Sequence, residues 1–299
     1  MIKRSLYFSN PAYLSTTKEQ MVIKRKEFDD VFTPIEDLGL IVLDHHQITI
    51  TQSLLAKLMN NNVAVISCNE THHPTGMLLN LDGNSLQSQK FKAQINASQP
   101  VKKQLWQQTI IAKLQNQGRL LNCQKKNGDF LLELAKQVRS GDPSNCEAQG
   151  AVYYWKNIFP EYLDFQRERT GFPPNNLLNY GYAILRALVA RCLTGSGLLP
   201  TLGIFHKNQY NAYCLADDIM EPYRVYVDQV VVNIIKTGAD FNEMNITIKQ
   251  ELLKIPAMDV KIDEQKSPLM NAVQRTTASL SRSFETKSAL LLYPIFNVE

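Results

Sequence analysis

The chain lacks any apolar run that is long enough to cross a membrane. Its longest candidates, residues 230–235 and 290–296, fall well short of the ~20 residues that a spanning helix needs. Lys3 and Arg4 are followed by no apolar stretch, so we expect no secretory signal. These absences predict a protein without membrane association.

Cysteine is scarce, with five residues among 299 and no CxxC pair. A scattered, odd number of cysteines argues against a zinc cage and against a disulfide framework. We therefore expect a cytoplasmic protein. Internal repeats and low-complexity linkers are also absent, and 44% of the residues are hydrophobic. This composition predicts one large core or two modest ones.

The net charge is only +4, but its distribution is uneven. Residues 1–90 carry eight basic and nine acidic side chains, residues 91–145 carry nine and three, and residues 146–299 carry fifteen and sixteen. A concentrated basic segment binds a polyanion by releasing its counterions. Taken alone, the segment is better explained as a solvated helix face.

Two kinds of pattern divide the chain. Short runs rich in Val, Ile, Leu, Tyr or Thr predict strands at 5–9, 12–16, 21–25, 39–43, 47–50 and 63–67. Thr51 suits the cap of one helix at 52–61. Later patterns predict helices at 86–97, 100–117, 128–140, 143–159, 174–194, 211–237, 242–254 and 268–292. The fold class is thus α+β, with a small β-rich domain over residues 1–85 and a larger all-helical domain over residues 86–299.

Three stretches of the helical half carry polar residues that a helix bundle does not need. In the first, residues 141–155, Asp142 suits an N-cap and Pro143 the first helical position. Glu147 then lies in the first two turns, where small neighbours leave room beside its carboxylate. Taken alone, an acidic residue there is better explained by the helix dipole.

The second stretch contains His206, the only histidine outside the β-rich part, in a predicted loop. The third contains Asp217, Asp218 and Glu221, whose spacing places them on adjoining parts of one helix face. Their mutual repulsion needs a compensating cation, which Arg224 could supply. Pro222 predicts a helix start or a kink beside these carboxylates.

One histidine and two or three carboxylates form a mixed nitrogen and oxygen ligand set. Such a set suits Mg²⁺ or Mn²⁺, and the imidazole favours Mn²⁺. With a basic segment in the same chain, the natural substrate is a phosphodiester. Because adjacent residues of a strand point apart, the pairs His45–His46 and His72–His73 are predicted to be turn or surface residues.

The same stretches resemble a known family. Glu147 in CEAQGAVYYW, the stretch PPNNLLNYGYAILRAL, His206 in LGIFHKNQYN, and DDIMEPYR occur in the order seen in CRISPR-associated adaptation integrases. The resemblance covers nearly the whole chain and is closest to type II systems, which carry an MEPFR-like motif. Two positions depart from the pattern: Tyr223 stands where Phe is usual, and Val225 where a proline often follows the arginine.

The resemblance implies the roles of individual residues. Glu147, His206 and Glu221 are expected to be catalytic ligands of Mg²⁺ or Mn²⁺, and Asp218 a further acidic ligand position. Supporting or packing roles next to these ligands are expected for Asn179, Tyr180 and Arg224.

The activity implied is CRISPR spacer acquisition by a metal-dependent DNA endonuclease and integrase, without a nucleotide cofactor. The 3′-hydroxyl ends of double-stranded prespacer DNA are expected to attack phosphodiesters at the CRISPR repeat. The partners implied are a second copy of the chain, a small ferredoxin-like adaptation protein in a heterohexamer, and a type II effector nuclease.

No motif in the chain reads bases, so we predict contacts with the DNA backbone. The predicted contacts are among Lys102, Lys103, Arg119, Lys125, Lys126 and Arg139. Two other functions stay open: a metal-dependent nuclease of branched DNA, with water as the nucleophile, and a non-catalytic DNA-binding scaffold.

Overall fold

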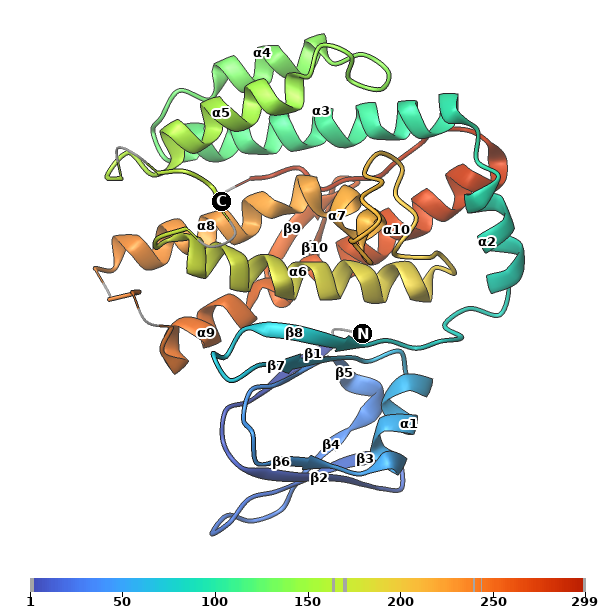
Figure 1. Ribbon diagram of the computed structural model, residues 1–299, viewed down its shortest axis with the longest axis vertical. Helices are drawn as coiled ribbons and strands as arrows, with labels where there is room; N and C mark the ends of the chain where they lie inside the picture. Colours follow the sequence, from blue (N-terminus) through green and yellow to red (C-terminus); the bar gives the residue numbers. More distant parts are fainter. Residues whose placement is uncertain (1–2, 163–164, 169–170, 239, 243, 298–299) are drawn as a thin grey trace.

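The computed structural model describes residues 3–162, 165–168, 171–238, 240–242 and 244–297. A β-rich amino-terminal part is followed by a mostly helical part, as the sequence patterns predict (Figure 1). The amino-terminal elements are β1 (Arg4–Phe8), β2 (Ala12–Thr17), β3 (Gln20–Lys24), β4 (Val31–Pro34), η1 (Ile35–Asp37), β5 (Leu38–Leu43), β6 (Ile48–Ile50), α1 (Gln52–Asn60), β7 (Ala64–Cys68) and β8 (Pro74–Leu78).

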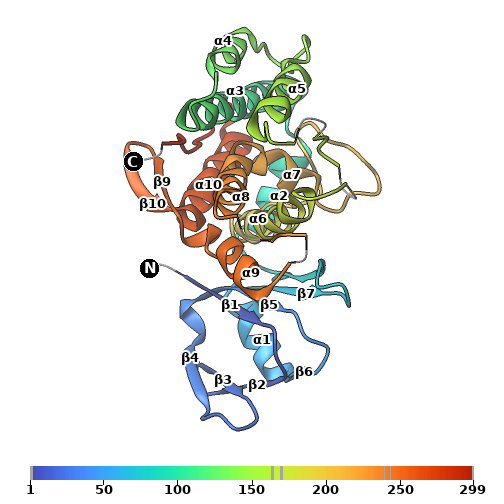
Figure 2. The same ribbon diagram turned by 90° about the vertical axis from the view of Figure 1, so that its left-hand side faces the viewer.

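These strands form two four-stranded sheets, with the orders β1-β5-β7-β8 and β4-β3-β2-β6. Strand β5 pairs in parallel with β1 and β7 in the middle of the first sheet. Its side chains face two different cores, because successive residues of a strand point to opposite faces. Ile41 packs in the cluster that includes α1 and the second sheet, whereas Leu40 and Val42 pack against the helices. The first sheet therefore lies between the second sheet and the helical part (Figures 1 and 2).

One buried helix packs against several other elements of the helical part. The elements of this part are α2 (Gln87–Ile95), α3 (Gln99–Cys123), α4 (Asp129–Gln137), α5 (Cys146–Ile158), α6 (Asn175–Gly195), α7 (Cys214–Met220), η2 (Glu221–Tyr223), α8 (Arg224–Lys236), α9 (Ile246–Leu253), η3 (Ile255–Ala257), β9 (Asp259–Ile262), β10 (Gln265–Pro268) and α10 (Leu269–Thr286). Helix α6 is buried over most of its length, and α3, α4 and α5 lie on the side away from the sheets (Figure 1). None of the described helices is long and apolar enough to cross a membrane.

Several sequence predictions are corrected by the structure. The carboxy-terminal half is not all-helical, because β9 and β10 form an antiparallel hairpin. Strands β4 and β8 were not predicted; both are short, and each carries a proline that weakens the strand pattern. The helix predicted at 268–292 ends at Thr286, because Lys287 adopts a left-handed conformation with φ 56°. The helix predicted at 211–237 is interrupted by η2, and Pro222 lies in the first turn of this 3-10 helix, which is one of the two positions predicted for it.

A buried ionic cluster joins the first sheet to α9. Asp44 is 2% exposed and accepts a hydrogen bond from Lys249 Nζ at 2.9 Å. The hydroxyl of Tyr7 also donates to this carboxylate, and His72 Nδ1 lies 2.8 Å from its Oδ1. His72 is exposed, as the sequence predicted, and its ring also contacts this buried carboxylate.

Candidate active site

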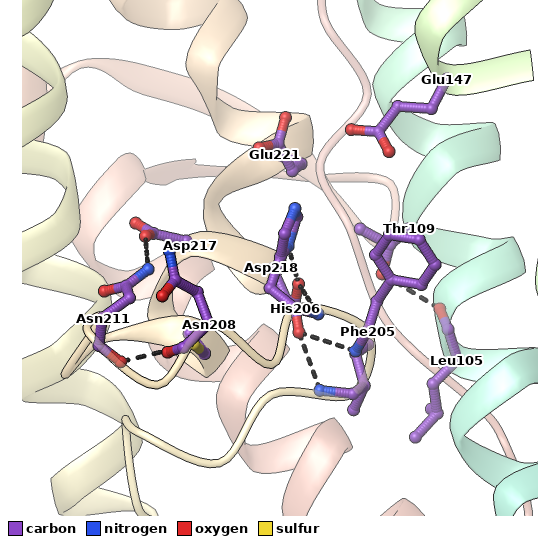
Figure 3. A network of polar contacts seen from close by, with 12 residues as sticks. Leu105, Thr109, Glu147, Phe205, His206, Asn208, Asn211, Asp217, Asp218 and Glu221 are labelled. Carbon is purple, nitrogen blue, oxygen red and sulfur yellow. Dashed lines mark hydrogen bonds and ion pairs between the residues drawn. The ribbon is translucent and has the colours of Figure 1, made fainter. Parts of the chain in front are cut away.

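The three predicted catalytic residues come from three separate elements. Glu147 lies in the first turn of α5, His206 in the loop between α6 and α7, and Glu221 at the junction of α7 with η2. In Figure 3 the imidazole of His206 points from its loop towards Glu221, and Glu147 approaches from the side of α3. The structure therefore brings Glu147 together with two residues that lie 59 and 74 positions further along the chain.

Asp142 positions the first turn of α5. Its Oδ1 accepts the backbone N–H of Cys146 at 2.9 Å, and its Oδ2 accepts that of Glu147 at 2.9 Å. These bonds satisfy two of the donors that a helix amino terminus leaves free. The helix begins three residues later than predicted, with Asn145 at the cap position and Pro143 outside the helix. Asp142 nevertheless makes the hydrogen bonds expected of a capping side chain.

Lys113 on α3 lies between the two glutamates. Its Nζ donates to Glu147 Oε1 at 2.8 Å and lies 2.8 Å from Glu221 Oε2. The Lys113 side chain is only 9% exposed. Sequence reasoning counted this lysine only as part of the basic segment, because no local pattern relates residue 113 to residues 147 and 221. Both carboxylates thus converge on one cation.

The charge of Glu221 is strongly stabilised. Burial alone would raise the pKa of this carboxyl, but Arg224 and Lys113 outweigh it and lower the pKa to about 2. Arg224 Nε lies 3.0 Å from Glu221 Oε1. The same balance acts on Lys113: burial opposes its charge, but Glu221 and Glu147 raise the pKa of the ammonium. Carboxylate and ammonium are therefore both charged at neutral pH.

Asp218 holds the loop that carries His206. Its buried carboxylate accepts the backbone N–H groups of Ile204 at 2.7 Å and Phe205 at 3.0 Å, and Oδ1 lies 2.5 Å from His206 Nδ1. This side-chain bond is the main reason that the pKa of His206 is raised. A Cβ atom at Gly203 would lie 2.7 Å from Asp218 Oδ2, so the loop needs glycine to approach so closely. With Nδ1 on Asp218, the Nε2 atom of His206 is the one left for the site.

The side chains at this point suit a divalent cation, although among the described residues no three His, Cys, Asp or Glu side chains are grouped as a ready metal site. Lys113 shows that the space between Glu147 and Glu221 favours positive charge. Two carboxylates and an imidazole are donors that Mg²⁺ or Mn²⁺ accepts. The chemistry of the donor set therefore fits such an ion.

Comparison with known proteins decides the family. Residues 6–254 match the family model described as CRISPR associated protein Cas1. The chain belongs to the Cas1 family. It is 34% identical over 293 residues to the CRISPR-associated endonuclease Cas1 of Neisseria meningitidis serogroup C (strain 8013), covering 97% of this chain and 94% of the relative. This similarity agrees with the type II-like resemblance.

Two solved structures share the Cas1 fold of this chain. A casposase bound to integration product superposes with a TM-score of 0.79 at 19% identity, over 100% of this chain and 96% of the other. A chain of a Cas6-RT-Cas1–Cas2 complex gives a TM-score of 0.75 at 16% identity, over 99% of this chain and 36% of the other. At these identities the similarity establishes the fold alone.

Of the residues predicted to support the metal ligands, Asn179 and Arg224 are linked to the surroundings of Glu221, whereas Tyr180 lies near Asp44. Asn179 accepts a hydrogen bond from Arg167 at 2.7 Å. Arg167 and Arg224 both lie over the ring of Tyr182, at 5.1 and 4.7 Å from its centroid, so Asn179 is linked to the surroundings of Glu221. Tyr180 is buried, and burial and the charge of Asp44 raise its pKa, so it belongs to the sheet side of α6.

Of the six predicted DNA-binding residues, five lie on α3 or just past its end, and Arg139 follows α4. Lys102 and Lys103 lie in the first two turns of α3, and Lys125 and Lys126 just past its last residue. A helix of 25 residues is roughly 37 Å long, so the charges on α3 are spread over its length. Together with Arg139, we call these residues the basic track. Lys103, Lys125 and Arg139 are exposed. Lys126 donates to the carbonyl of Ile158 at 2.7 Å, and Arg119 to Asn116 at 3.4 Å.

One aromatic pair beside the site was missed by sequence reasoning. The ring of Phe205 stacks on Trp106 with centroids 4.2 Å apart and planes at 1°. Phe205 directly precedes His206, and it is 44% exposed. Spacing could not reveal the pair, because ninety-nine positions separate the two residues.

Proposed function

We propose that this Cas1-family chain is a metal-dependent DNA endonuclease and integrase of CRISPR spacer acquisition. The observation that carries the proposal is the convergence of Glu147 and Glu221 on one cation position, with His206 aimed at the same place. The family of the chain and a relative named as an endonuclease support it. So does the shared fold with a casposase bound to integration product.

Glu147, Glu221 and Nε2 of His206 would hold Mg²⁺ or Mn²⁺. When bound, such an ion polarises the phosphodiester, activates the attacking hydroxyl and stabilises the leaving oxygen. Asp218 would accept a hydrogen bond from the Nδ1–H group of His206, which leaves the Nε2 lone pair free to bind. Because the Asp218 carboxylate accepts hydrogen bonds from Ile204, Phe205 and His206 of this loop, we assign it the orientation of His206 rather than direct ligation. Arg224 fixes the carboxylate of Glu221.

The proposed reaction is transesterification. The 3′-hydroxyl oxygen of a prespacer strand attacks a phosphorus atom at the edge of the repeat. The bond from that phosphorus to the 3′ oxygen of the flanking nucleotide breaks, and that oxygen takes up a proton in place of the one that the attacking hydroxyl loses. One phosphodiester is exchanged for another, so no nucleotide is consumed. The basic track would bind the DNA backbone while this exchange takes place.

The proposed assembly follows the resemblance. Residues 1–85 would mediate dimerisation and contact the DNA ends, and residues 86–299 would carry the chemistry. Prespacer DNA, CRISPR repeat DNA and a small ferredoxin-like adaptation protein would bind the dimer in a heterohexamer, with a type II effector nuclease as a further partner. The match to a chain of a Cas6-RT-Cas1–Cas2 complex supports a Cas partner of this kind.

A strand-transfer assay tests the proposal. The protein, with and without the small adaptation partner, is given a labelled 3′-hydroxyl duplex, a supercoiled plasmid with the repeat, and Mn²⁺ or Mg²⁺. We expect joined product from the wild type, none from Glu147→Ala or His206→Ala, and wild-type product from Glu251→Gln, an exposed glutamate on α9 paired with Lys254. Nicking without joining would indicate the branched-DNA nuclease, and binding without chemistry the scaffold.

A further inference from the structure

The centre of the site already holds a cation that belongs to the chain. The ammonium of Lys113 is 2.8 Å from an oxygen of each glutamate, and its side chain is almost fully buried. Two carboxylates at 7% and 20% side-chain exposure would repel each other without it. Lys113 therefore compensates the charge that a divalent ion would otherwise compensate.

A divalent ion and this ammonium compete for the same oxygens. An ion that binds Glu147 Oε1 and Glu221 Oε2 must displace Nζ from both. The displaced ammonium stays on a buried stem, and a buried charge without a partner is strongly unfavourable. Metal binding to the free protein is therefore weakened by the need to find another anion for Lys113.

The nearby carboxylates already have partners. Asp218 is engaged by the His206 loop, and Asp142 by the first turn of α5. Asp217 is paired with Arg186 at 2.6 Å and Asn211 at 2.7 Å. A phosphate of bound DNA, by contrast, would bring a new negative charge to this point. The phosphate would accept a charge-assisted hydrogen bond from the ammonium.

We propose that Lys113 is a resident cation that keeps the divalent ion out of the free protein and turns to a DNA phosphate when the ion enters. This inference rests on the proposed function, because it takes DNA as the substrate and Mg²⁺ or Mn²⁺ as the ion. Metal and DNA then bind cooperatively, and the coupling is reciprocal by thermodynamic necessity. Lys113 is a positioning residue in this scheme, because it controls when the carboxylates become available.

The test measures Mn²⁺ affinity, from the electron paramagnetic resonance signal of free Mn²⁺, for wild type and Lys113→Met. Each protein is measured alone and with a duplex that has dideoxy 3′ ends, which cannot be joined. For the wild type we expect DNA to strengthen Mn²⁺ binding at least about fivefold. For Lys113→Met we expect Mn²⁺ binding without DNA to be at least about fivefold tighter than for the wild type, and DNA to add little.

Two variants control for charge and for folding. Lys254→Met removes a lysine that is paired with Glu251 on the surface, and should bind Mn²⁺ as the wild type does. Lys113→Arg keeps the cation and should keep both weak binding and coupling to DNA. It also keeps the inference testable if Lys113→Met does not fold, since loss of the coupling in a folded Lys113→Arg would overturn it.

The outcomes separate the inference from the proposed function. Equal or weaker Mn²⁺ binding by Lys113→Met, or an equal effect of DNA on both proteins, would overturn the role of Lys113 even if the wild type joins DNA. Absence of strand transfer and of any Glu221-dependent Mn²⁺ binding would overturn the proposed function itself.

Discussion

The Nδ1 atom of His206 lies 2.5 Å from Oδ1 of Asp218, a fully buried carboxylate in the second turn of α7. The same carboxylate accepts the backbone N–H groups of two residues that precede His206. One side chain thus sets the path of the loop and the orientation of the ring. The hydrogen bond also links two stretches, LGIFHKNQYN and DDIMEPYR, that the sequence presents as separate motifs.

Replacing Asp218 with Asn tests this relationship. Asn has one acceptor oxygen where the carboxylate has two, so the ring of His206 loses its fixed orientation. We expect Mn²⁺ affinity in the presence of DNA to fall about 10–100-fold, as measured by titration calorimetry. Asp217→Asn is the matched control, because Asp217 pairs with Arg186 and not with His206. An equal loss in both variants would contradict the orienting role.

Asp228 makes stability depend on pH. Burial raises the pKa of this carboxyl to about 6, although Tyr182 and Tyr154 donate hydrogen bonds that favour its charged form. A folded pKa above the unfolded value of about 3.9 stabilises the fold below that value, and this stability is lost as the pH rises through 6. Relative to Asp228→Asn, the unfolding free energy of the wild type should fall by up to about 3 kcal/mol between pH 4 and 7.

Urea denaturation of both proteins across this pH range measures the difference. Other groups titrate in the same range, but they are common to both proteins and cancel. Parallel curves for wild type and Asp228→Asn would show that the carboxyl titrates normally despite its burial.

The exposed basic residues should determine the salt dependence of DNA binding. Lys103→Gln, Lys125→Gln and Arg139→Gln each remove one exposed positive charge from the basic track. If each contacts a phosphate, the slope of log affinity against log salt becomes less steep by about 0.9 per variant. Fluorescence anisotropy at several salt concentrations measures the slope. Lys254→Gln, outside the track, should leave it unchanged, and an unaltered slope in all four variants would remove these residues from the interface.

The pair of Lys249 and Asp44 should stabilise the junction between the first sheet and α9. Both side chains are buried, at 5% and 1% exposure. Lys249→Met leaves the Asp44 charge without its cation, and loss of one partner of a buried pair costs about 3–5 kcal/mol. Lys254→Met, at the carboxy-terminal cap of the same helix, breaks an exposed pair and should cost less than about 1 kcal/mol. Comparable urea midpoints for the two variants would contradict the structural role of the buried pair.

Much of the architecture could be read from local patterns. Thr51 caps α1 by accepting the N–H of Leu54, as predicted, and Pro222 marks the break between α7 and α8. Such features depend on residues within one or two turns, so the chain carries them in short stretches. Strand β4 and the β9–β10 hairpin were missed, because strands of four residues leave too short a pattern to recognise.

The sequence by itself determined the order of the elements, the Cas1-like motifs, and which residue types could bind a cation. Only the tertiary structure decided how those residues meet. Lys113 lies 34 and 108 positions from the two glutamates that it bridges, and Lys249 lies 205 positions from Asp44. Contacts at such separations depend on how helices and sheets pack, and packing is a property of the whole folded chain rather than of any short segment.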